Sequence, residues 1–196
     1  MTPKSGAART ALYQILDAMT RMLAPILAFT SEEIWAAMPH GKGSDGSCVL
    51  LNDIPAYDEA RCLSPEQAAR WETVISLRDE VNKALEQARN EQGVKKNQDA
   101  AIVLHLSDTQ FADWEKGAFL PGFDAADLAA IFIVSQVQLE KGQGHGYQSE
   151  AFPGMSIGVS ASEAPKCSRC WNHNQQVDPE TELCPRCAGV LKKIKI

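Results

Sequence analysis

The sequence predicts an α+β protein of several units: a helical bundle, a small α/β unit and a C-terminal knuckle built on four cysteines. Three observations predict this fold class. Apolar residues recur at helical spacing in the first half of the chain, short apolar runs of strand length follow, and two Cys-x2-Cys pairs lie near the end. With 196 residues, of which 44% are hydrophobic and 22% charged, the chain is long enough to bury a core. We expect the units to span residues 1–93, 94–164 and 165–196.

The first predicted helix carries an apolar stripe whose members recur at alternating steps of four and three residues: Ala8, Leu12, Ile15, Met19, Met22 and Ile26. Pro25 should kink or interrupt this helix. The run Thr30-Ser31-Glu32-Glu33 is typical of a capping box and predicts a second, shorter helix that ends at Met38, before Pro39. Residues 40–47 are rich in glycine and serine, so we expect a loop there.

A long helix is predicted next. The run Ser64-Pro65-Glu66-Gln67 is a start signal, with serine as the cap and proline at the first helical position. Apolar residues line one face of this helix: Trp71, Val74, Leu77, Val81, Ala84, Leu85 and Ala88. Gly93 is well placed to stop it.

Beyond Gly93 the apolar period changes from helical to strand-like. Short apolar runs predict strands over residues 101–106, 131–134 and 155–160. Helical patterns lie over residues 108–118 and 124–130, and a turn-rich break lies over 142–146. We therefore expect a small α/β unit between the helical region and the cysteine knuckle.

The four cysteines of the knuckle follow the pattern Cys167-x2-Cys170-x13-Cys184-x2-Cys187, which is the spacing of a tetrahedral zinc site with four cysteine ligands. Each Cys-x2-Cys pair, called a hook below, contains one arginine. The arginine lies beside a site where four thiolates and one Zn2+ together carry a net charge of −2. Four thiolates close the coordination shell, so we expect one structural Zn2+ per chain rather than a catalytic metal.

Two disulfides, or four unrelated buried cysteines, are the alternatives to a metal site. Nothing resembles a signal peptide, and Cys48 and Cys62 stand outside the pattern, as expected in a reducing cytosol. The sequence therefore favours a metal site in a cytoplasmic protein. It does not indicate a role for Cys48 or Cys62.

Charge is distributed unevenly along the chain. Residues 165–196 contain six Lys/Arg and three acids, a formal +3, so the preceding residues carry −9 and the chain as a whole −6. Any polyanion should therefore meet the tail. No apolar run approaches the roughly 20 residues of a membrane span, so no membrane partner is expected. We find no glycine-rich phosphate loop, no Ser/His/Asp arrangement and no paired catalytic carboxylates, and we assign no catalytic residue.

Three groups of residues carry a family resemblance. They are Leu-Ala-Pro-Ile-Leu-Ala-Phe-Thr-Ser-Glu-Glu-Ile-Trp (23–35), Arg-Asp-Glu-Val-Asn-Lys-Ala-Leu-Glu-Gln-Ala-Arg (78–89), and Cys-Ser-Arg-Cys-Trp (167–171) with Cys-Pro-Arg-Cys (184–187). The first resembles the anticodon-binding helical bundle shared by the isoleucyl, valyl and leucyl class I synthetases. The second and third together resemble the C-terminal end of bacterial isoleucyl-tRNA synthetases.

This resemblance implies the portion of isoleucine–tRNA ligase that recognises the anticodon region of tRNA(Ile). The full-length family members activate isoleucine with ATP and charge tRNA(Ile). The partners implied are tRNA(Ile) and the remainder of the synthetase, which carries the catalytic and editing domains. The isolated chain is expected to be a monomer and catalytically inactive.

Trp171, Arg169 and Arg186 are the candidate tRNA-binding residues. Trp171 follows a metal ligand in a small knuckle with almost no core, which favours a rigid platform on which a base stacks. The alternative is that Trp171 packs on the α/β unit as an anchor. Arg169 and Arg186 can contact phosphate or a base edge, or can instead compensate the charge of the thiolates. We expect Lys192, Lys193 and Lys195 to form a solvated tail.

The chain departs from the family at two places. His173 stands where an aromatic such as tyrosine is expected. The sequence therefore leaves open whether a second stacking ring exists at this position. Lys95-Lys96-Asn97-Gln98 is more basic than is usual in the family.

Three rival functions also remain: a formamidopyrimidine-DNA glycosylase-like repair enzyme, a zinc-ribbon interaction module, and a redox Cys-x2-Cys protein. The repair enzyme needs an N-terminal proline, which Met1-Thr2-Pro3 does not offer directly.

Overall fold

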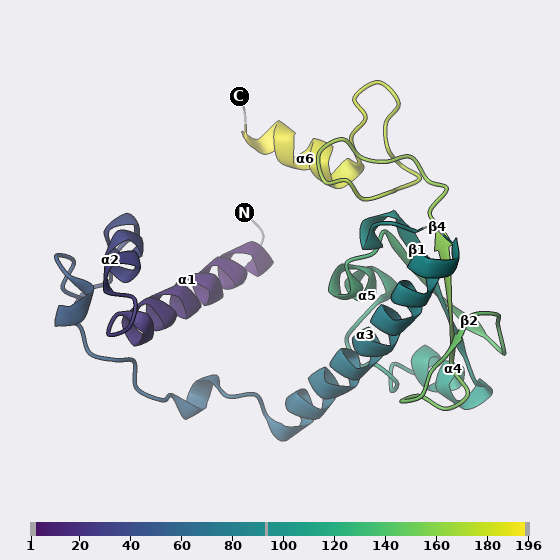
Figure 1. Cartoon of the computed structure of the whole chain (residues 1–196), viewed down its shortest axis with the longest axis horizontal. Helices are drawn as coiled ribbons and strands as arrows, with labels where there is room; N and C mark the ends of the chain where they lie inside the picture. Colours follow the sequence, from purple (N-terminus) through teal and green to yellow (C-terminus); the bar gives the residue numbers. More distant parts are fainter. Residues whose placement is uncertain (1–2, 93, 195–196) are drawn as a thin grey trace. The chain divides into compact units, whose positions relative to one another are not determined.

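The structure, a computed structural model, describes residues 3–92 and 94–194; Gly93 and Lys195 of the sequence analysis lie outside them. It confirms the α+β class, with six α-helices and one four-stranded sheet in the described part. The chain divides into two compact units, residues 1–62 and 63–196 (Figure 1). In the described ranges, no helix combines the length and the apolar character that crossing a membrane requires.

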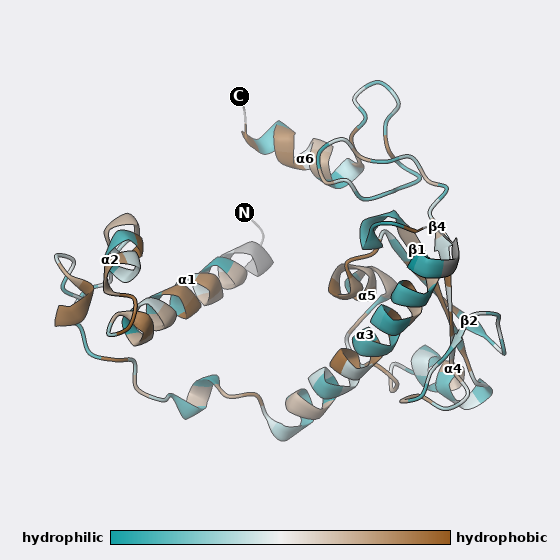
Figure 2. Ribbon diagram, in the orientation of Figure 1, coloured by the Kyte–Doolittle hydropathy of each residue, from teal (hydrophilic) through white to brown (hydrophobic). Residues whose placement is uncertain are grey.

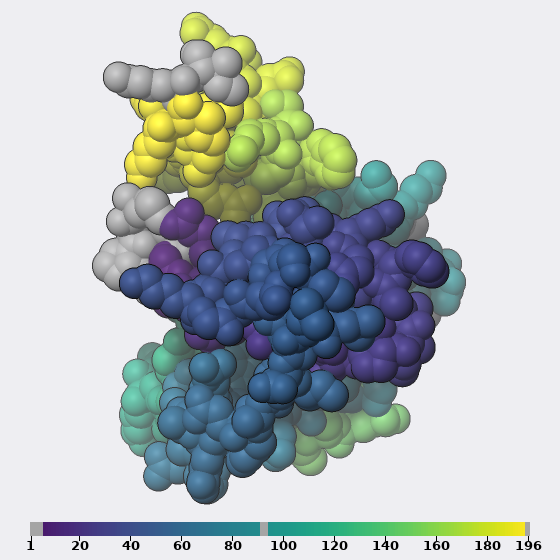
Figure 3. Space-filling view, turned by 90° about the vertical axis from the view of Figure 1, so that its left-hand side faces the viewer, coloured from purple at the N-terminus to yellow at the C-terminus, as the bar shows by residue number. Residues whose placement is uncertain are grey.

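The first unit is helical. It contains α1 (Pro3–Leu23) and α2 (Ala28–Ala37), followed by two short 3-10 helices, η1 (Val49–Leu51) and η2 (Glu59–Arg61). The chain turns between α1 and α2, as Pro25 predicts, because proline cannot continue the hydrogen-bond ladder. The segment up to η1 packs as one continuous body in the space-filling view (Figure 3).

The predicted capping box at residues 30–33 is wrong. Helix α2 already begins at Ala28, and its N-cap residue, Leu27, makes no side-chain cap. The Glu32 carboxylate instead accepts hydrogen bonds from Cys48 Sγ at 2.7 Å and from the Val49 backbone N–H at 3.0 Å. The Glu32 carboxylate therefore binds the residues that follow the loop of residues 40–47 and does not cap α2. The helix starts one turn earlier than the sequence pattern indicated.

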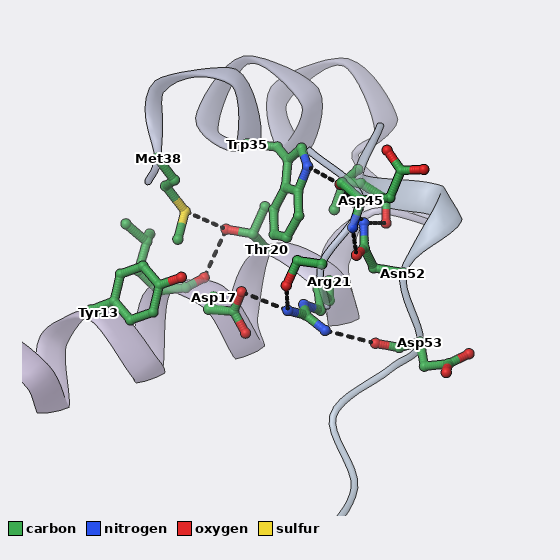
Figure 4. A network of polar contacts seen from close by, with 12 residues as sticks. Tyr13, Asp17, Thr20, Arg21, Trp35, Met38, Asp45, Asn52 and Asp53 are labelled. Carbon is green, nitrogen blue, oxygen red and sulfur yellow. Dashed lines mark hydrogen bonds and ion pairs between the residues drawn. The ribbon is translucent and has the colours of Figure 1, made fainter. Parts of the chain in front are cut away.

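Trp35 of α2 forms the centre of the first unit and is 1% exposed. Its indole N–H donates to the Asp45 carbonyl at 3.0 Å, and the Arg21 guanidinium lies 5.3 Å from its ring centroid (Figure 4). Arg21 also donates to Asp17 Oδ1 at 3.0 Å and to the Asp53 carbonyl at 3.4 Å. This network fastens the loop after α2 onto α1.

The predicted apolar stripe of α1 is exposed. Leu12, Ile15 and Met19 are 66%, 55% and 48% exposed, and the stripe is visible as brown segments along α1 in Figure 2. Farther along, Ile26 is 80% and Phe29 91% exposed. The helix therefore forms as its periodicity predicts, but within the described residues of its own unit, 3–62, this face stays exposed.

The second unit begins with α3 (Pro65–Gln92). Its predicted start signal is confirmed, and Ser64 and Gln67 form a capping box: Gln67 N–H donates to Ser64 Oγ at 3.2 Å, and Ser64 N–H donates to Gln67 Oε1 at 3.0 Å. Six residues of the predicted apolar face are buried, each at most 3% exposed: Val74, Leu77, Val81, Ala84, Leu85 and Ala88. Trp71 is 38% exposed and meets the Phe123 ring edge-on at 5.2 Å.

The sheet contains β1 (Ala100–Leu106), β2 (Gln136–Lys141), β3 (Tyr147–Gln148) and β4 (Ser156–Ala161) in the order β2-β1-β4-β3. Strand β1 is parallel to β2 and antiparallel to β4, so Ile102 lies between Val137 and Val159. The short helix η3 (Asn97–Asp99) leads into β1, and α4 (Asp108–Glu115) and α5 (Ala125–Phe132) connect β1 to β2.

One face of the sheet is buried against helices. Alternate residues of β1 point to this face and are fully buried: Ala100, Ile102, Leu104 and Leu106. They share one core with Leu77 and Val81 of α3 and with Leu128 and Phe132 of α5. Because α3 belongs to this core, the structural boundary falls after residue 62 and not at the expected residue 93.

The predicted strand over residues 131–134 is wrong. Helix α5 runs on to Phe132, and Ile133 ends it in the left-handed conformation at φ 61°. Asp124 and Asp127 form a capping box that starts this helix, and its apolar face extends as far as Phe132. The second strand therefore starts at Gln136.

Glu80 of α3 holds a loop of the α/β region. It is 2% exposed, and its Oε2 accepts hydrogen bonds from Ser149 Oγ at 2.7 Å and from Glu150 N–H at 2.6 Å. Lys83 Nζ lies 2.8 Å from its other oxygen. Burial alone would raise the pKa of Glu80, but these donors lower it to about 2. These bonds explain why an acid occupies the buried face of α3.

Candidate metal centre and adjoining pocket

The four predicted cysteines lie together. Their four sulfur atoms are within 4.8 Å of one another, and Cys170 Sγ lies 3.8 Å from Cys184 Sγ. A tetrahedron with zinc–sulfur bonds of about 2.3 Å has edges of about 3.8 Å, so this spacing fits a metal ion bound by sulfur alone. Cys167, Cys184 and Cys187 are buried, and Cys170 is half-buried.

Each cysteine pair is shaped by a different local structure. In the first, Trp171 N–H donates to the Cys167 carbonyl at 2.9 Å and closes a tight turn. The second pair starts α6 (Pro185–Ile194), which the sequence analysis did not predict and which places Cys187 in its first turn. Cys184 N–H donates to Cys167 Sγ at 3.3 Å and joins the two pairs. The loop and α6 pack as one compact lobe (Figure 3).

The sulfur atoms differ in acidity. Burial raises the pKa of Cys167, but backbone N–H groups around its sulfur outweigh this and bring the pKa to about 6. For Cys184, burial dominates and raises the pKa to about 11. Not all four cysteines favour the thiolate form by themselves. A bound divalent cation would supply the positive charge that favours it.

The two arginines within the hooks contact the cluster. The hydrogen bond to Cys170 raises the pKa of the Arg186 guanidinium. Burial acts to raise the pKa of Cys187, but the hydrogen bond from Arg169 is the main factor that lowers it below its usual value. Both guanidinium groups therefore lie beside sulfur atoms of the cluster, where a positive charge favours the thiolate form.

His173 attaches the knuckle to the sheet. Its ring nitrogens lie 2.6 Å from the Ala164 carbonyl and 3.1 Å from Asp99 Oδ1. Lys166 Nζ contacts the same carboxylate oxygen at 2.6 Å, and His173 N–H donates to Ser135 Oγ at 2.7 Å. With 15% of its side chain accessible, His173 is a docking residue in the structure rather than an open second ring.

Trp171 lies on the outside of the knuckle. It is 61% exposed, so the structure does not bury it as an anchor. Trp171 lines a pocket of about 430 Å3, together with residues before and within the first hook and on the loop before the second: Pro165, Lys166, Cys167, Ser168, Val177, Asp178, Pro179 and Glu182. The structure therefore places a free aromatic surface beside the candidate metal centre.

Sequence reasoning missed part of this neighbourhood. Asp99, Ser135 and Glu182 come from three separate segments, and no spacing links them to the cysteines. Pro185 did carry a usable signal, because proline favours the first position of a helix. Lys192 and Lys193 lie in the last turn of α6, where cations interact favourably with the helix dipole.

Comparison with known proteins points in one direction. Residues 1–104 match the family described as the anticodon-binding domain of tRNA ligase. The chain is 38% identical to isoleucine–tRNA ligase of Staphylococcus epidermidis over 97% of its length, and 39% identical to that of Staphylococcus aureus over 95%. It covers 20% and 19% of these two relatives, so it spans about a fifth of their length.

Proposed function

This chain belongs to the family of anticodon-binding domains of tRNA ligases, and we propose that it is the tRNA-recognition portion of an isoleucine–tRNA ligase. Its substrate in this role is the anticodon region of tRNA(Ile). The similarity to two isoleucine–tRNA ligases, which extends over the metal cluster as well as the helical region, supports this assignment. The predicted cytoplasmic location and monomeric state form part of the same proposal.

We propose that the cysteine cluster holds one Zn2+ per chain. The four predicted ligands are Cys167, Cys170, Cys184 and Cys187, whose sulfur atoms converge. Bound there, zinc would fix the fold of residues 165–196, since the buried cluster contains little besides the cysteines and two half-buried apolar residues. Four sulfur ligands leave no position for water, which argues for a structural role.

The exposure of Trp171 is the main observation behind the proposed tRNA recognition. A 61% exposed indole follows directly after a cysteine of the cluster, and its backbone N–H is bonded within the first hook. An exposed ring on a backbone that is fixed within the hook is suited to stacking on an unpaired base, which contributes about 1–3 kcal/mol. Arg169 and Arg186 would add contacts to phosphate through donors that the sulfur atoms leave free.

The chemistry of charging is proposed to lie in the rest of the synthetase. Activation of isoleucine with ATP, and editing, would belong to parts of the enzyme that the relatives contain beyond the fifth matched here. The exposed apolar stripe of α1 supports a contact with such a part, because a face with Leu12, Ile15 and Ile26 open to water is unfavourable.

A binding experiment tests the proposal. The chain of residues 1–196 is incubated with labelled tRNA(Ile), with a tRNA(Ile) whose anticodon bases are replaced, and with duplex DNA, each with and without zinc. We expect retention on a filter of tRNA(Ile) above the other two, and loss of retention without zinc. Preference for duplex DNA would instead favour the repair-enzyme alternative, and retention of none of the three would contradict the proposal.

Catalysis gives a second check. The chain alone should show no isoleucine-dependent exchange of pyrophosphate into ATP. Exchange above the level of a buffer control would contradict the assignment of the activation chemistry to other parts of the enzyme.

A further inference from the structure

The outer edge of β4 is covered along part of its length. Strand β3 pairs with β4 through Tyr147–Gln148, which lie opposite Ile157 and Ser156. Before Tyr147 the chain leaves the strand conformation, and Gly146 there has φ 135°, which glycine adopts far more readily than other residues. Residues 158–161 of β4 are therefore paired on one side, with β1, and open on the other.

The register shows which backbone groups of β4 point to this open edge. Ser162 N–H donates to the Asp99 carbonyl at 2.8 Å, and this pair continues the antiparallel register of β1 and β4. Because hydrogen-bonded pairs alternate along an antiparallel ladder, Ser160 also bonds to β1. Val159 and Ala161 therefore direct their N–H and C=O groups outward, where within the described ranges nothing pairs with them.

Helix α3 forms the second wall of a groove beside this edge. A cavity of about 310 Å3 lies there, lined by Ala84 and Ala88 of α3, by Tyr147 of β3 and by Val159 of β4. The two alanines are 2% and 3% exposed, and their small side chains leave space beside the strand. Among the described residues, no charged side chain lines the cavity. The groove thus combines unpaired backbone groups with an uncharged lining.

The open edge selects an extended polypeptide as its ligand. Its N–H and C=O groups present donors and acceptors in alternation, and the backbone of a second strand matches that pattern. Nucleic acid offers phosphate acceptors in place of this alternation, and the lining holds no cation to attract them. Ligand residues that bond to Val159 and Ala161 point their side chains to the same face as these two, toward α3. Small apolar side chains at alternate positions therefore fit the groove.

We propose that the groove between α3 and the outer edge of β4 binds an extended segment of the same enzyme from outside residues 1–196. The segment adds a strand to the sheet and exchanges backbone hydrogen bonds with Val159 and Ala161. The inference rests on the proposed function, since it takes the chain to be one portion of a longer synthetase.

The small number of open groups favours a tethered segment over a separate partner. Each hydrogen bond replaces one to water and has a modest net effect. Two separate molecules must also lose translational and rotational freedom when they associate. A segment of the same polypeptide avoids most of that loss, because tethering gives it an effective concentration of about millimolar. The chain covers 20% and 19% of two relatives, so about four-fifths of their length can supply such a segment.

A synthetic peptide tests the open edge. Amide NMR spectra of residues 1–196 are recorded with acetyl-Thr-Val-Thr-Val-Thr-amide, and we expect shifts centred on Val159 and Ala161 with a Kd of about millimolar. Methylating both valine nitrogens removes the donors that face β4 and should abolish the shifts. Methylating the central threonine nitrogen, which points away from β4, should preserve them. Absence of shifts in β4 with the unmodified peptide, or equal shifts from the two methylated peptides, would overturn the groove.

Two variants at one position test the strand itself. Ala161→Pro removes an outward donor and leaves the bonds of β4 to β1 in place, so it should weaken peptide binding at least about threefold. Ala161→Ser keeps the N–H and should bind as wild type does. Circular dichroism reports whether each variant folds. Equal weakening by both variants, or none by a folded Ala161→Pro, would overturn the role of Ala161; if Ala161→Pro does not fold, the methylated peptides decide.

Hydrogen exchange in the full-length protein tests the source of the segment. In residues 1–196 the amides of Val159 and Ala161 should exchange fast, and that of Ser160 slowly because it bonds to β1. In the full-length protein we expect the first two to exchange at least about tenfold more slowly and Ser160 to be unchanged. Mass spectrometry with fragmentation of peptides from β4 resolves the three amides.

Each outcome bears on one of the two proposals. Fast exchange of Val159 and Ala161 in the full-length protein would overturn the tethered segment, even where the peptide binds. Protection that increases with protein concentration would identify a second copy as the occupant and would also overturn it. These measurements contain no RNA, so their failure leaves tRNA recognition standing. Failure of tRNA(Ile) to bind, with the peptide and exchange results as expected, would overturn the proposed function alone.

Discussion

Helices α1 and α3 carry the same kind of apolar stripe, yet only α3 buries it. Leu77 and Val81 of α3 are fully buried against the sheet, whereas Leu12 and Ile15 of α1 are 66% and 55% exposed. The two helices look alike in sequence because periodicity reports how a helix presents its side chains. Whether the same unit also supplies the surface that covers them is a separate property, and of these two helices only α3 is covered by the described residues of its own unit.

The comparison extends to what completes each region. The sheet and α3 form one core from their own residues. The first unit buries only three apolar residues in its central cluster, and the knuckle buries cysteines in place of a core. Two regions of this chain thus depend on something besides their own apolar side chains, and we infer a protein surface for α1 and a metal for the knuckle.

Removing the metal should have the largest effect. Cys184→Ser deletes one sulfur ligand, and structural zinc contributes about 10–16 kcal/mol in small zinc domains, so residues 165–194 should lose their fold. The core of α3 and the sheet should survive, because its apolar residues are buried without the knuckle's help. Amide NMR spectra should show loss of dispersion confined to the knuckle, and elemental analysis should show loss of zinc.

Cys62→Ser is the matched control for this prediction. Cys62 is exposed and lies outside the cluster, so its replacement should leave one zinc per chain and an unchanged spectrum. Carefully reduced wild-type protein without any metal, or a dispersed knuckle spectrum in Cys184→Ser, would contradict the dependence of the knuckle on zinc.

A core truncation in α3 should have the next largest effect. Leu77→Ala leaves a cavity in a fully buried site and should lower the free energy of unfolding by about 2–5 kcal/mol. Chemical denaturation followed by circular dichroism measures this. A loss below about 1 kcal/mol would show that the α3 face is not packed in solution as the structure has it.

Acid should weaken the same unit through Glu80. Its pKa is lowered from 4.5 to about 2 by its hydrogen bonds, so its contribution is complete above about pH 4.5 and is lost as the pH falls toward 2. The shift corresponds to about 3 kcal/mol. Urea unfolding between pH 2.5 and 6 should therefore show a steeper loss for wild type than for Glu80→Gln. Glu86→Gln, on an exposed position of the same helix, should follow wild type; parallel curves for all three would contradict the role of Glu80.

The smallest effect is expected on α1. Ile15→Ala makes a comparable truncation to Leu77→Ala, but at a position that is 55% exposed, and should change the free energy of unfolding by less than about 0.5 kcal/mol. The same denaturation experiment measures it. A loss comparable to that of Leu77→Ala would show that α1 is covered in solution, and dependence of that loss on protein concentration would identify a second copy as the cover, against the proposed monomer.

The elements that could be predicted were those whose signal is local. Ser64 and Gln67 indicate the start of α3, and the short apolar run of residues 101–106 indicates strand β1, whose residues alternate between buried and half-buried. The cysteine cluster was predictable because the spacing of each pair determines how near its two sulfur atoms can lie.

The elements that could not be predicted depend on distant partners. The residues around Ile131 have the composition of a strand, but the capping box at Asp124 and the packing of Phe132 carry the helix through them. Glu32 has the sequence context of a cap, but Val49 and Cys48, far along the chain, bind its carboxylate.

Residues of the candidate site were missed for the same reason. Glu182 lies beside Ser168 and Trp171 only because the loop before Cys184 folds back onto the first hook. The sequence left open whether a second stacking ring stands at His173, and the docking role of this residue could not be predicted because its partner Asp99 lies 74 residues away.

The affinity of the chain for tRNA(Ile), measured for wild type, Trp171→Ala and Trp71→Ala, tests the central claim most directly. Trp171 is 61% exposed on the knuckle and Trp71 is 38% exposed on α3, so the second variant controls for the loss of a partly exposed indole. With zinc content measured on the same preparations, Trp171→Ala should weaken binding about ten- to a hundredfold at full zinc, the equivalent of one base stack, and Trp71→Ala should not. Unchanged affinity of Trp171→Ala at full zinc would contradict the claim that this knuckle recognises tRNA through its exposed tryptophan.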